Sequence, residues 1–453
     1  MLTILASDLK MQQSPNRSSA LVQHDKTSYK KKEYKIMIKR LFLILAMFSQ
    51  MTYSQNHTDA TRLASDKPDL QQAFAAADTQ LRYQLEQVAK IRKAKKDWTL
   101  VPRSIEKDGN LRMVRQPDWC CGFFSGELWL MYQHSHDSFW REQAVSNTWI
   151  IERAKLDGGS HDLGFMVYNS FGKAYELTGE QSYRDVVVRA AETLASRFDS
   201  HVGCIRSWSW GTPERWQFAV IIDNMMNLEL LFEACKLTGN RRYHDIAVSH
   251  ANTTLKNHFR PDGSSYHVVD YNPKDGSVIK RITHQGLFDE SVWSRGQAWG
   301  LYGFTMCYRY THDKAYLAQA QKIAKFWFSQ ADMPWDLIPY WDMRDPAIPT
   351  GVGPAKDGSC PRDASAAAII ASALYELATF VSAKEAKTYR NYADRIMYSL
   401  TTKYLAAPHT AQGFLLQHST GNYPAGDEID VPINYADYYY LEALNRSQTF
   451  KNK

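Results

Sequence analysis

The sequence is poor in two features that would assign it to large classes of protein. It has six cysteines in 453 residues, and none stands in a CxxC or His-rich spacing typical of a zinc site. An apolar run at 41–48 has only eight residues, whereas a membrane span needs about 20, and no later run reaches that length. A membrane-spanning chain and a disulfide framework are therefore excluded. Cys235 and Cys307 fall mid-helix among apolar neighbours and are expected as buried free thiols.

The body of the chain also lacks an excess of charge of either sign. The first forty residues hold nine Lys or Arg against three Asp or Glu, which accounts for the whole formal net charge of +6 and leaves 45 residues of each sign after residue 40. Binding to nucleic acid depends on clustered Lys and Arg that displace counterions, so a neutral body argues against that partner. The composition, with 44% hydrophobic residues, is that of a folded globular protein.

The basic lead contains a pattern typical of a secretory signal peptide. Met37-Ile38-Lys39-Arg40 precedes the apolar run, and the small-residue stretch 52–54 follows it. We predict a signal peptide at 37–54, a non-native or disordered extension at 1–36, and a periplasmic or secreted protein; a disordered extension over the whole region is the alternative. The remaining boundaries are a linker at 55–72, a main domain at 73–446 and a tail at 447–453.

A helix pair repeats along the chain. Residues 174–183 (AYELTGEQSY) recur as residues 234–243 (ACKLTGNRRY), with looser copies at 308–316 and 376–389. The glycine suits a left-handed helix cap, and so short a turn makes the two helices antiparallel neighbours. Apolar periodicity predicts twelve helices, near residues 73–96, 122–135, 137–154, 163–177, 180–196, 223–237, 240–257, 294–310, 313–329, 363–378, 384–404 and 434–445.

Two kinds of helix alternate in this pattern. Those that start near 122, 163, 223, 294, 363 and 434 are rich in Ala, Gly, Leu and aromatic residues on all sides, as helices covered on both faces must be, whereas their partners carry a charged face. Six inner and six outer helices predict an all-α fold, an (α/α)6 barrel. An open α-solenoid is the alternative. Because only the connections from outer to inner helices are long, we expect them to build the functional site at one rim.

Two carboxylates stand at equivalent points of successive hairpins, where Asp162 and Asp223 each open an inner helix. Either can be an N-cap that accepts backbone N–H groups of the first turn. In a ring, however, equivalent helix ends converge on the axis, so the pair can face one ligand, as acid–base chemistry on a glycoside requires. One of the two would then have to stay protonated, which needs burial or the charge of the other.

A third inner helix begins with the run Trp-Ser-Arg-Gly-Gln-Ala-Trp at 293–299. Its cation, Arg295, can grip a substrate carboxylate with its two-pronged guanidinium or form a structural ion pair. His267 and Gln285 lie in the long connection ahead of this helix. The long connections also hold many Trp and Tyr residues, which stack on sugar rings at a concave mouth or simply pack.

An ordered set of motifs makes the chain resemble the unsaturated glucuronyl hydrolases, glycoside hydrolase family 88. The resemblance covers residues 75 to 446, and two departures, Cys120-Cys121 and Phe124, stand beside Trp119. The motifs are Trp-x-x-Gly-Phe at 119–123, His-Asp-Leu-Gly-Phe at 161–165, Ile-Asp-Asn-Met at 222–225, Ser-Arg-Gly-Gln-Ala-Trp at 294–299, Arg-Asp-Ala-Ser-Ala at 362–366 and Asn-Tyr-Ala-Asp-Tyr at 434–438.

The resemblance implies a glycosidase that removes the 4,5-unsaturated uronic acid from the nonreducing end of lyase-generated glycosaminoglycan oligosaccharides, without a metal or nucleotide cofactor. An acid protonates C4 of the vinyl ether, water adds at C5, and the hemiketal opens. By motif matching, Asp223 is the general acid and then the base, and Asp162 is the second essential carboxylate. The implied substrate-binding residues are His161, Trp119, Trp208, His267, Gln285, Arg295, Trp299, Ser419 and Thr420.

Three other functions compete with this one. The related unsaturated rhamnogalacturonyl hydrolases share the barrel and the reaction but act on pectin fragments, and the Ser-Arg-Gly-Gln-Ala-Trp form favours the glucuronyl family. A sugar epimerase would rely on histidine bases rather than on an Asp pair. A noncatalytic carbohydrate-binding protein would have no need to keep both Asp residues and Arg295.

Overall fold

The chain divides into two units, residues 1–65 and 66–453, and the computed structural model describes residues 67–348 and 360–451. The described helices and strands all belong to the second unit. The predicted extension at 1–36 and signal peptide at 37–54 lie outside the described residues. None of the described helices has the length and hydropathy that a membrane crossing needs.

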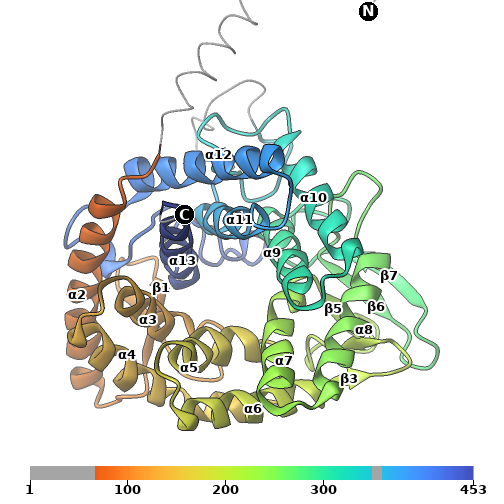
Figure 1. Cartoon of the computed structure of the whole chain (residues 1–453), viewed down its shortest axis with the longest axis horizontal. Coiled ribbons are helices and arrows are strands. Elements are labelled where there is room, and N and C mark those ends of the chain that lie inside the picture. Colours follow the sequence, from red (N-terminus) through yellow and green to blue (C-terminus); the bar gives the residue numbers. More distant parts are fainter. Residues whose placement is uncertain (1–66, 349–359, 452–453) are drawn as a thin grey trace, which may run out of the picture. The chain divides into compact units, whose positions relative to one another are not determined.

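The helices of the second unit form two concentric rings (Figure 1). The ring closes because α13 packs against both α11 and α3, so the (α/α)6 barrel is confirmed and the open solenoid is wrong. The inner ring contains α3 (Phe123–Ser135), the π-helix η2 (Gly164–Gly172) continued by α5 (Lys173–Thr178), α7 (Asn224–Thr238), α9 (Ser294–Thr311), α11 (Ala364–Leu377) and α13 (Asn434–Lys451). The outer ring contains α2 (Leu70–Lys95), α4 (Ser138–Ile150), α6 (Gln181–Ala195), α8 (Arg241–Asn257), α10 (Lys314–Phe328) and α12 (Ala383–Ser399).

Several helix ends differ from the prediction by a few residues. Helix α2 starts inside the predicted linker because Asp69 caps it, accepting the backbone N–H of Gln72. Helix α13 continues to Lys451, through most of the predicted tail. The outer helices α4 and α12 end early, and each is followed by a short helix of another type, η1 (Glu152–Leu156) and η3 (Leu400–Tyr404).

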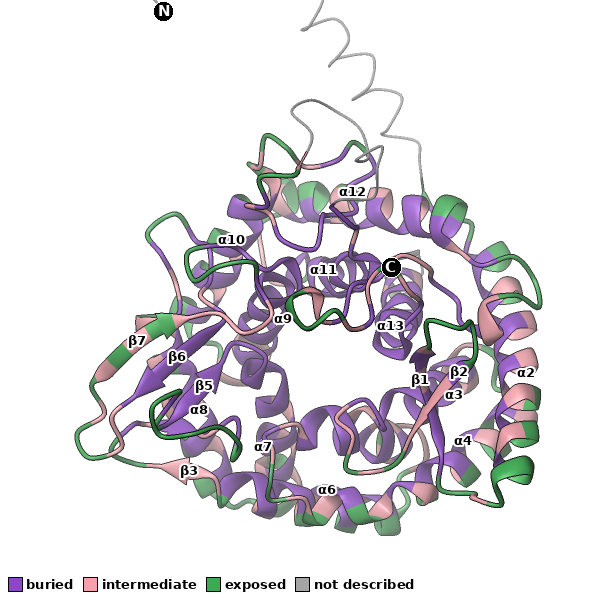
Figure 2. Cartoon of the chain, turned by 180° about the vertical axis from the view of Figure 1, so that it is seen from behind, coloured by how far each residue is buried: buried purple, intermediate pink, exposed green. Residues whose placement is uncertain are grey.

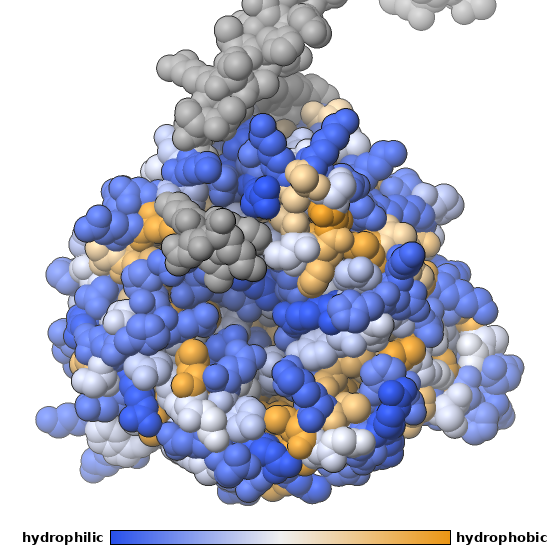
Figure 3. All heavy atoms as spheres, viewed as in Figure 1, coloured by the Kyte–Doolittle hydropathy of each residue, from blue (hydrophilic) through white to orange (hydrophobic). Residues whose placement is uncertain are grey.

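Burial separates the two rings as the sequence predicts (Figure 2). Helix α11 is buried along its whole length, whereas α12 keeps an exposed charged face. Small residues allow the inner helices to approach closely: a Cβ atom added at Gly303 of α9 would lie 2.5 Å from Met225 Cβ of α7. All six cysteines are free thiols; Cys307 is buried, and Cys235 is half-buried. The face seen in Figure 3 is mainly hydrophilic, with scattered hydrophobic side chains.

Short antiparallel strands, which the sequence did not predict, order the long connections. They form two pairs and one three-stranded sheet: β1 (Val101–Ile105) with β2 (Leu111–Val114), β3 (Phe198–Asp199) with β4 (Cys204–Ile205), and β5 (Ala219–Ile221) with β6 (Val268–Tyr271) and β7 (Val278–Ile282). The β5–β6 pairing matters for the site. It continues as a hydrogen bond from Ile222 N to His267 O, 3.0 Å long, and so brings His267 beside the start of α7.

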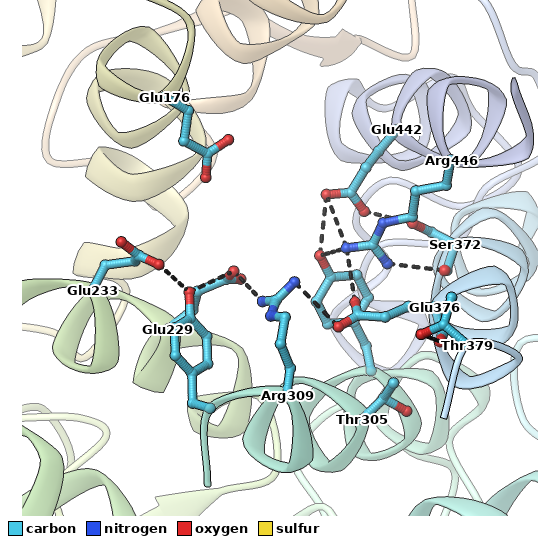
Figure 4. A network of polar contacts seen from close by, with 12 residues as sticks. Glu176, Glu229, Glu233, Thr305, Arg309, Ser372, Glu376, Thr379, Glu442 and Arg446 are labelled. Atoms are coloured by element: carbon cyan, nitrogen blue, oxygen red, sulfur yellow. Dashed lines mark hydrogen bonds and ion pairs between the residues drawn. The ribbon is translucent and has the colours of Figure 1, made fainter. Parts of the chain in front are cut away.

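Charged side chains link the inner helices towards their C-terminal ends (Figure 4). Arg309 of α9 lies between Glu229 of α7 and Glu376 of α11, 3.1 Å from the latter. Arg446 of α13 reaches the same Glu376 at 3.0 Å and Glu442 at 3.6 Å. Two cations thus join four neighbouring inner helices, α7, α9, α11 and α13.

Candidate active site

Three inner helices begin with an aspartate at the same rim, but only one of these aspartates caps its helix. Asp363 accepts the backbone N–H groups of Ser365 and Ala366 at the start of α11. Asp223 occupies the N-cap position of α7 without a capping bond, and among the described residues its Oδ2 has no hydrogen-bond partner. Asp162 precedes the first residue of its helix, Leu163, and turns its side chain elsewhere. The capping explanation therefore fails for the two predicted catalytic residues.

The Asp223 carboxyl is suited to hold a proton near neutral pH. The residue is only 7% exposed. Burial raises the pKa of Asp223 to about 7; the Arg295 guanidinium lowers it, and the Asp162 carboxylate raises it. A carboxylic acid that keeps its proton at neutral pH is what a general acid requires.

His267 presents a fixed N–H group to Asp223. The backbone N–H groups of His284 and Gln285 both donate to His267 Nδ1, each over 3.1 Å. A nitrogen that accepts carries no proton, so the neutral ring carries its proton on Nε2, which lies 3.7 Å from Asp223 Oδ2. Burial lowers the pKa of His267 well below its usual value, so the ring stays neutral.

Asp162 is held as an acceptor by its own segment. The Ser160 hydroxyl donates to Asp162 Oδ2, and His161 Nε2 lies 3.3 Å from Oδ1. Burial lowers the pKa of His161, so this imidazole is neutral as well. The segment is fixed by the hydrogen bond from His161 N to Ser207 O, next to Trp208. Asp162 and Asp223 thus have different surroundings at neighbouring helix ends.

Arg295 forms the structural ion pair, one of its two predicted alternatives. Its guanidinium is 1% exposed, and Nη1 lies 2.9 Å from Asp363 Oδ2. Nη1 and Nη2 also donate to the backbone carbonyls of Thr420 and Gly421. Both terminal nitrogens of the guanidinium therefore donate to protein acceptors, and they are not free for the expected bidentate interaction with a substrate carboxylate. Arg295 instead anchors the tail loop, residues 417–424, to the start of α11.

The tail loop is also held by Gln285, whose Nε2 donates to Gly421 O over 3.2 Å. The Thr420 hydroxyl donates to Arg362 O and is buried, so it is not free to meet a sugar. The Ser419 hydroxyl is buried too, and it has no partner among the described residues. Of the two predicted hydroxyls, only that of Ser419 is unoccupied.

Aromatic side chains form two walls around these groups. On one side Trp119 packs on Tyr435, with ring centroids 5.0 Å apart, and on Phe165, which also contacts Trp299. On the other side Trp208 contacts His267 and a group of aromatic rings, namely the buried Trp216, the exposed Trp210 and His284. Aromatic contacts thus connect Trp119 to Trp299 through Phe165, and Trp208 to His267 beside Asp223.

The sequence of this chain matches the protein-family model of Glycosyl Hydrolase Family 88 over residues 91–452. The chain belongs to this family. It is 46% identical to an unsaturated glucuronyl hydrolase of Formosa agariphila over 77% of this chain and 83% of the relative, and 32% identical to an unsaturated chondroitin disaccharide hydrolase of Streptococcus pneumoniae over 73% and 81%.

Solved structures agree with this assignment to family 88. An unsaturated glucuronyl hydrolase specific for heparin superposes with a TM-score of 0.74 at 43% identity, covering 83% of this chain and 98% of that one. The unsaturated glucuronyl hydrolase of Bacillus sp. GL1 superposes with the same TM-score at 30% identity, covering 84% and 97%. The (α/α)6 barrel seen here is therefore the barrel of family 88.

Two residues of this family 88 site were missed as functional from the sequence. Asp363 belongs to the motif at 362–366, to which no role was assigned from the sequence. It precedes an inner helix at the same point as Asp162 and Asp223, and this equivalence could have indicated its importance. His284 contributes a backbone N–H that fixes the His267 tautomer. A backbone contribution carries no side-chain signal, so the sequence offered no means of finding it.

Proposed function

We propose that this family 88 protein releases the 4,5-unsaturated uronic acid from the nonreducing end of lyase-generated glycosaminoglycan oligosaccharides by hydrating the C4=C5 vinyl ether. The observation that carries the proposal is the state of Asp223, a buried carboxyl with a pKa near 7 and an uncapped oxygen beside a second carboxylate. Protonation of an electron-rich alkene needs such an acid.

In the proposed reaction the Asp223 carboxyl donates its proton to C4, and positive charge develops at C5 and the ring oxygen. Water then adds to C5 while the Asp223 carboxylate takes a proton from it, which restores the acid. The resulting hemiketal opens by breaking the bond between C5 and the ring oxygen. The hemiacetal left at C1 then releases the next sugar, and the former unsaturated uronate, now hydrated, leaves as an open-chain 4-deoxy-5-keto uronate.

Asp162 has two roles in this scheme. Its carboxylate raises the pKa of Asp223, so that the acid keeps its proton until the alkene arrives. Its negative charge also favours the positive charge that develops on the sugar ring. The Nε2–H group of His267 faces Asp223 and stabilises the carboxylate that remains after the proton has left.

The substrate class follows from the relatives. One related structure is specific for heparin, a curated relative is an unsaturated chondroitin disaccharide hydrolase, and a variant of the Streptococcus agalactiae enzyme is complexed with dGlcA-GalNAc6S. These names support unsaturated glycosaminoglycan disaccharides and oligosaccharides as substrates of this chain. No observation favours pectin fragments.

The test is the loss of the ultraviolet absorbance of the unsaturated uronate. The protein is incubated with lyase-generated disaccharides of chondroitin, hyaluronan and heparin, and with an unsaturated pectin fragment as the competing substrate. We expect the absorbance to disappear for at least one glycosaminoglycan disaccharide and to persist with Asp223→Asn. Asp437→Asn is the matched control, because Asp437 is another buried carboxyl with a pKa raised by burial, to about 8, and it bonds to Leu415 and Leu416 instead. Turnover of the pectin fragment alone would overturn the proposal.

We also propose that the protein is exported to the periplasm or secreted, on the strength of the pattern at 37–54. Mass spectrometry of the protein from its native host measures the mature N-terminus. We expect it to begin close after residue 54, and a chain that retains Met37 would contradict export through a cleaved signal peptide.

A further inference from the structure

A buried amide, that of Asn227, links the start of η2, which follows Asp162, to the start of α7, which follows Asp223. Asn227 lies one turn after Asp223 on α7 and is fully buried. Its Oδ1 accepts the backbone N–H of Phe165, at the start of η2, over 3.0 Å, and its Nδ2 lies 3.5 Å from Asp223 O. One side chain thus contacts the residue after Gly164 on one helix and the backbone of the proposed acid on the other.

The bond to Phe165 replaces a bond that the helix cannot make for itself. The first N–H groups of a helix have no partner within that helix, and a buried N–H group without a partner is costly. Asn227 supplies the acceptor from the neighbouring helix. The start of η2, two residues after Asp162, is therefore held against α7.

Backbone contacts on both sides leave this helix start no room to move. A Cβ atom added at Gly164 would lie 2.7 Å from both Cα and Oδ1 of Asn227. On the opposite side, a Cβ atom added at Gly122 would lie 2.3 Å from the carbonyl oxygens of Phe165 and Met166. The wide turn of a π-helix recurs at functional sites, and here it directly follows the segment that carries Asp162.

We propose that Asn227, together with Gly164, is a positioning residue that fixes the spacing between Asp162 and Asp223. The inference rests on the proposed function, in which Asp223 is the acid. The Asp162 carboxylate is one cause of the raised pKa of Asp223, so the spacing sets how strongly it acts. The repulsion between two like charges raises the pKa of the acid. For unit charges roughly 5 Å apart at an effective dielectric constant of about 20, each further ångström of separation reduces this rise in pKa by about 0.4 unit.

The test uses Asn227→Leu, Asn227→Ser and Gly164→Ala, with Asn445→Leu as the matched control. Asn445 is also a buried inner-helix asparagine, and its Nδ2 bonds to the carbonyl four residues earlier, Leu441 O, and to Leu130 O of the neighbouring helix α3. It lies in the C-terminal half of α13, away from the Asp pair. Asn227→Ser shortens the side chain but keeps it polar. It can therefore still be measured if Asn227→Leu does not fold.

The first measurement is the pH dependence of kcat/KM on an unsaturated disaccharide. Wider spacing lowers the pKa of Asp223, so the alkaline limb should move to lower pH by about 0.4 unit or more in the Asn227 and Gly164 variants. Asn445→Leu should lower the unfolding temperature without moving this limb. A limb that stays at the wild-type pH in folded Asn227→Ser and Gly164→Ala, or that moves equally in Asn445→Leu, would overturn the proposal.

The second measurement needs no substrate and therefore separates this proposal from the proposed function. The infrared band of the protonated Asp223 carboxyl, assigned as the band that Asp223→Asn removes, is titrated in the free protein. Its midpoint should shift downward in the Asn227 and Gly164 variants and stay in place in Asn445→Leu. If the wild-type protein turns over no unsaturated disaccharide, the proposed function fails, while this titration still decides whether Asn227 sets the spacing. An unshifted midpoint would refute the spacing role even in an active enzyme.

Discussion

Replacing Asp223 by Asn should abolish turnover and at the same time stabilise the protein, but only at neutral and alkaline pH. In the folded protein burial raises the pKa of Asp223 from 3.8 to about 7. Between these two values the unfolded chain gives up the proton while the folded protein keeps it, so wild-type stability falls as pH rises through this window. A pKa shift of about three units corresponds to about 4 kcal/mol. Above about pH 7, where Asp223 is ionised in the folded protein too, the buried carboxylate lowers the free energy of unfolding of the wild type by this full amount.

An asparagine side chain does not titrate, so Asp223→Asn escapes this cost. The entropy of a globular protein rises on unfolding by about 2.1 cal/mol/K per residue. For the roughly 390 residues of the second unit this entropy change is about 0.8 kcal/mol/K. The variant should therefore unfold up to about 5 °C above the wild type at about pH 8, and at nearly the same temperature at about pH 4. Its kcat should fall by a factor of roughly 10² to 10⁴ or more, the contribution of a general acid.

Thermal unfolding followed by circular dichroism across this pH range gives the first quantity, and the ultraviolet assay gives the second. Asp437→Asn again provides the contrast. Both Asp437 oxygens accept backbone N–H groups, from Leu415 and Leu416, so Asp437→Asn loses one of these bonds and should lower the unfolding temperature at about pH 4, where Asp223→Asn leaves it nearly unchanged. A stability difference between Asp223→Asn and wild type that does not change with pH would refute the assigned titration, and wild-type turnover would refute the role.

The remaining predictions concern pH, the buried ion pair of Arg295 and the charged network around Arg309. Because Asp223 must be protonated to act as the acid, kcat/KM of the wild type should fall above about pH 7, and a pH profile that is flat up to pH 9 would contradict this. Arg295→Met should cost about 3–5 kcal/mol because it leaves Asp363 buried and unpaired, whereas the double variant Arg295→Met/Asp363→Leu should recover part of this loss; denaturant titration measures both, and additive losses would argue against the pair. Arg295→Lys should raise KM and lower the unfolding temperature together, since a point charge cannot hold both carbonyls of the tail loop; steady-state kinetics and thermal unfolding check this, and a raised KM at unchanged stability would instead indicate direct contact with the substrate. Arg309→Met should lower the unfolding temperature but leave KM unchanged, because Arg309 pairs with Glu229 and Glu376 and not with the residues of the proposed site; a changed KM would show that this charged network is coupled to the site.

The ring of helices was predictable because its signals are local. The repeated Leu-Thr-Gly at 177–179 and 237–239 marks a helix end and a tight turn, and both glycines adopt the left-handed conformation that this requires, with φ of 71° and 73°. Apolar periodicity then distinguishes α11, buried on every side, from α12, which keeps a charged face. Neither signal depends on contacts between distant residues.

The short strands and the binding partners of Arg295 were not predictable, because both depend on residues that are distant in the sequence. Strand β5 has three residues and pairs with β6, which lies nearly fifty residues later. Arg295 had two chemically reasonable partners, a substrate carboxylate and a protein carboxylate. The choice was made by Asp363 and by the carbonyls of the tail loop, 68 and 125 or more residues away in sequence. No spacing within the motif around Arg295 contains that information.

The three aspartates at the rim show how one position in a repeated fold acquires three chemistries. All three stand at the start of an inner helix, where the helix dipole favours the carboxylate by roughly 0.3–1 kcal/mol. Asp363 accepts two backbone N–H groups and forms an ion pair with Arg295. Asp162 receives a hydroxyl from Ser160. At Asp223 burial without a capping bond works in the opposite direction, and a shift of about 4 kcal/mol outweighs the dipole several-fold. In the proposed function, what suits Asp223 to be the acid is therefore the absence of the partners that its two counterparts have, and any substitution that gives Asp223 such a partner should remove its proton and the activity together.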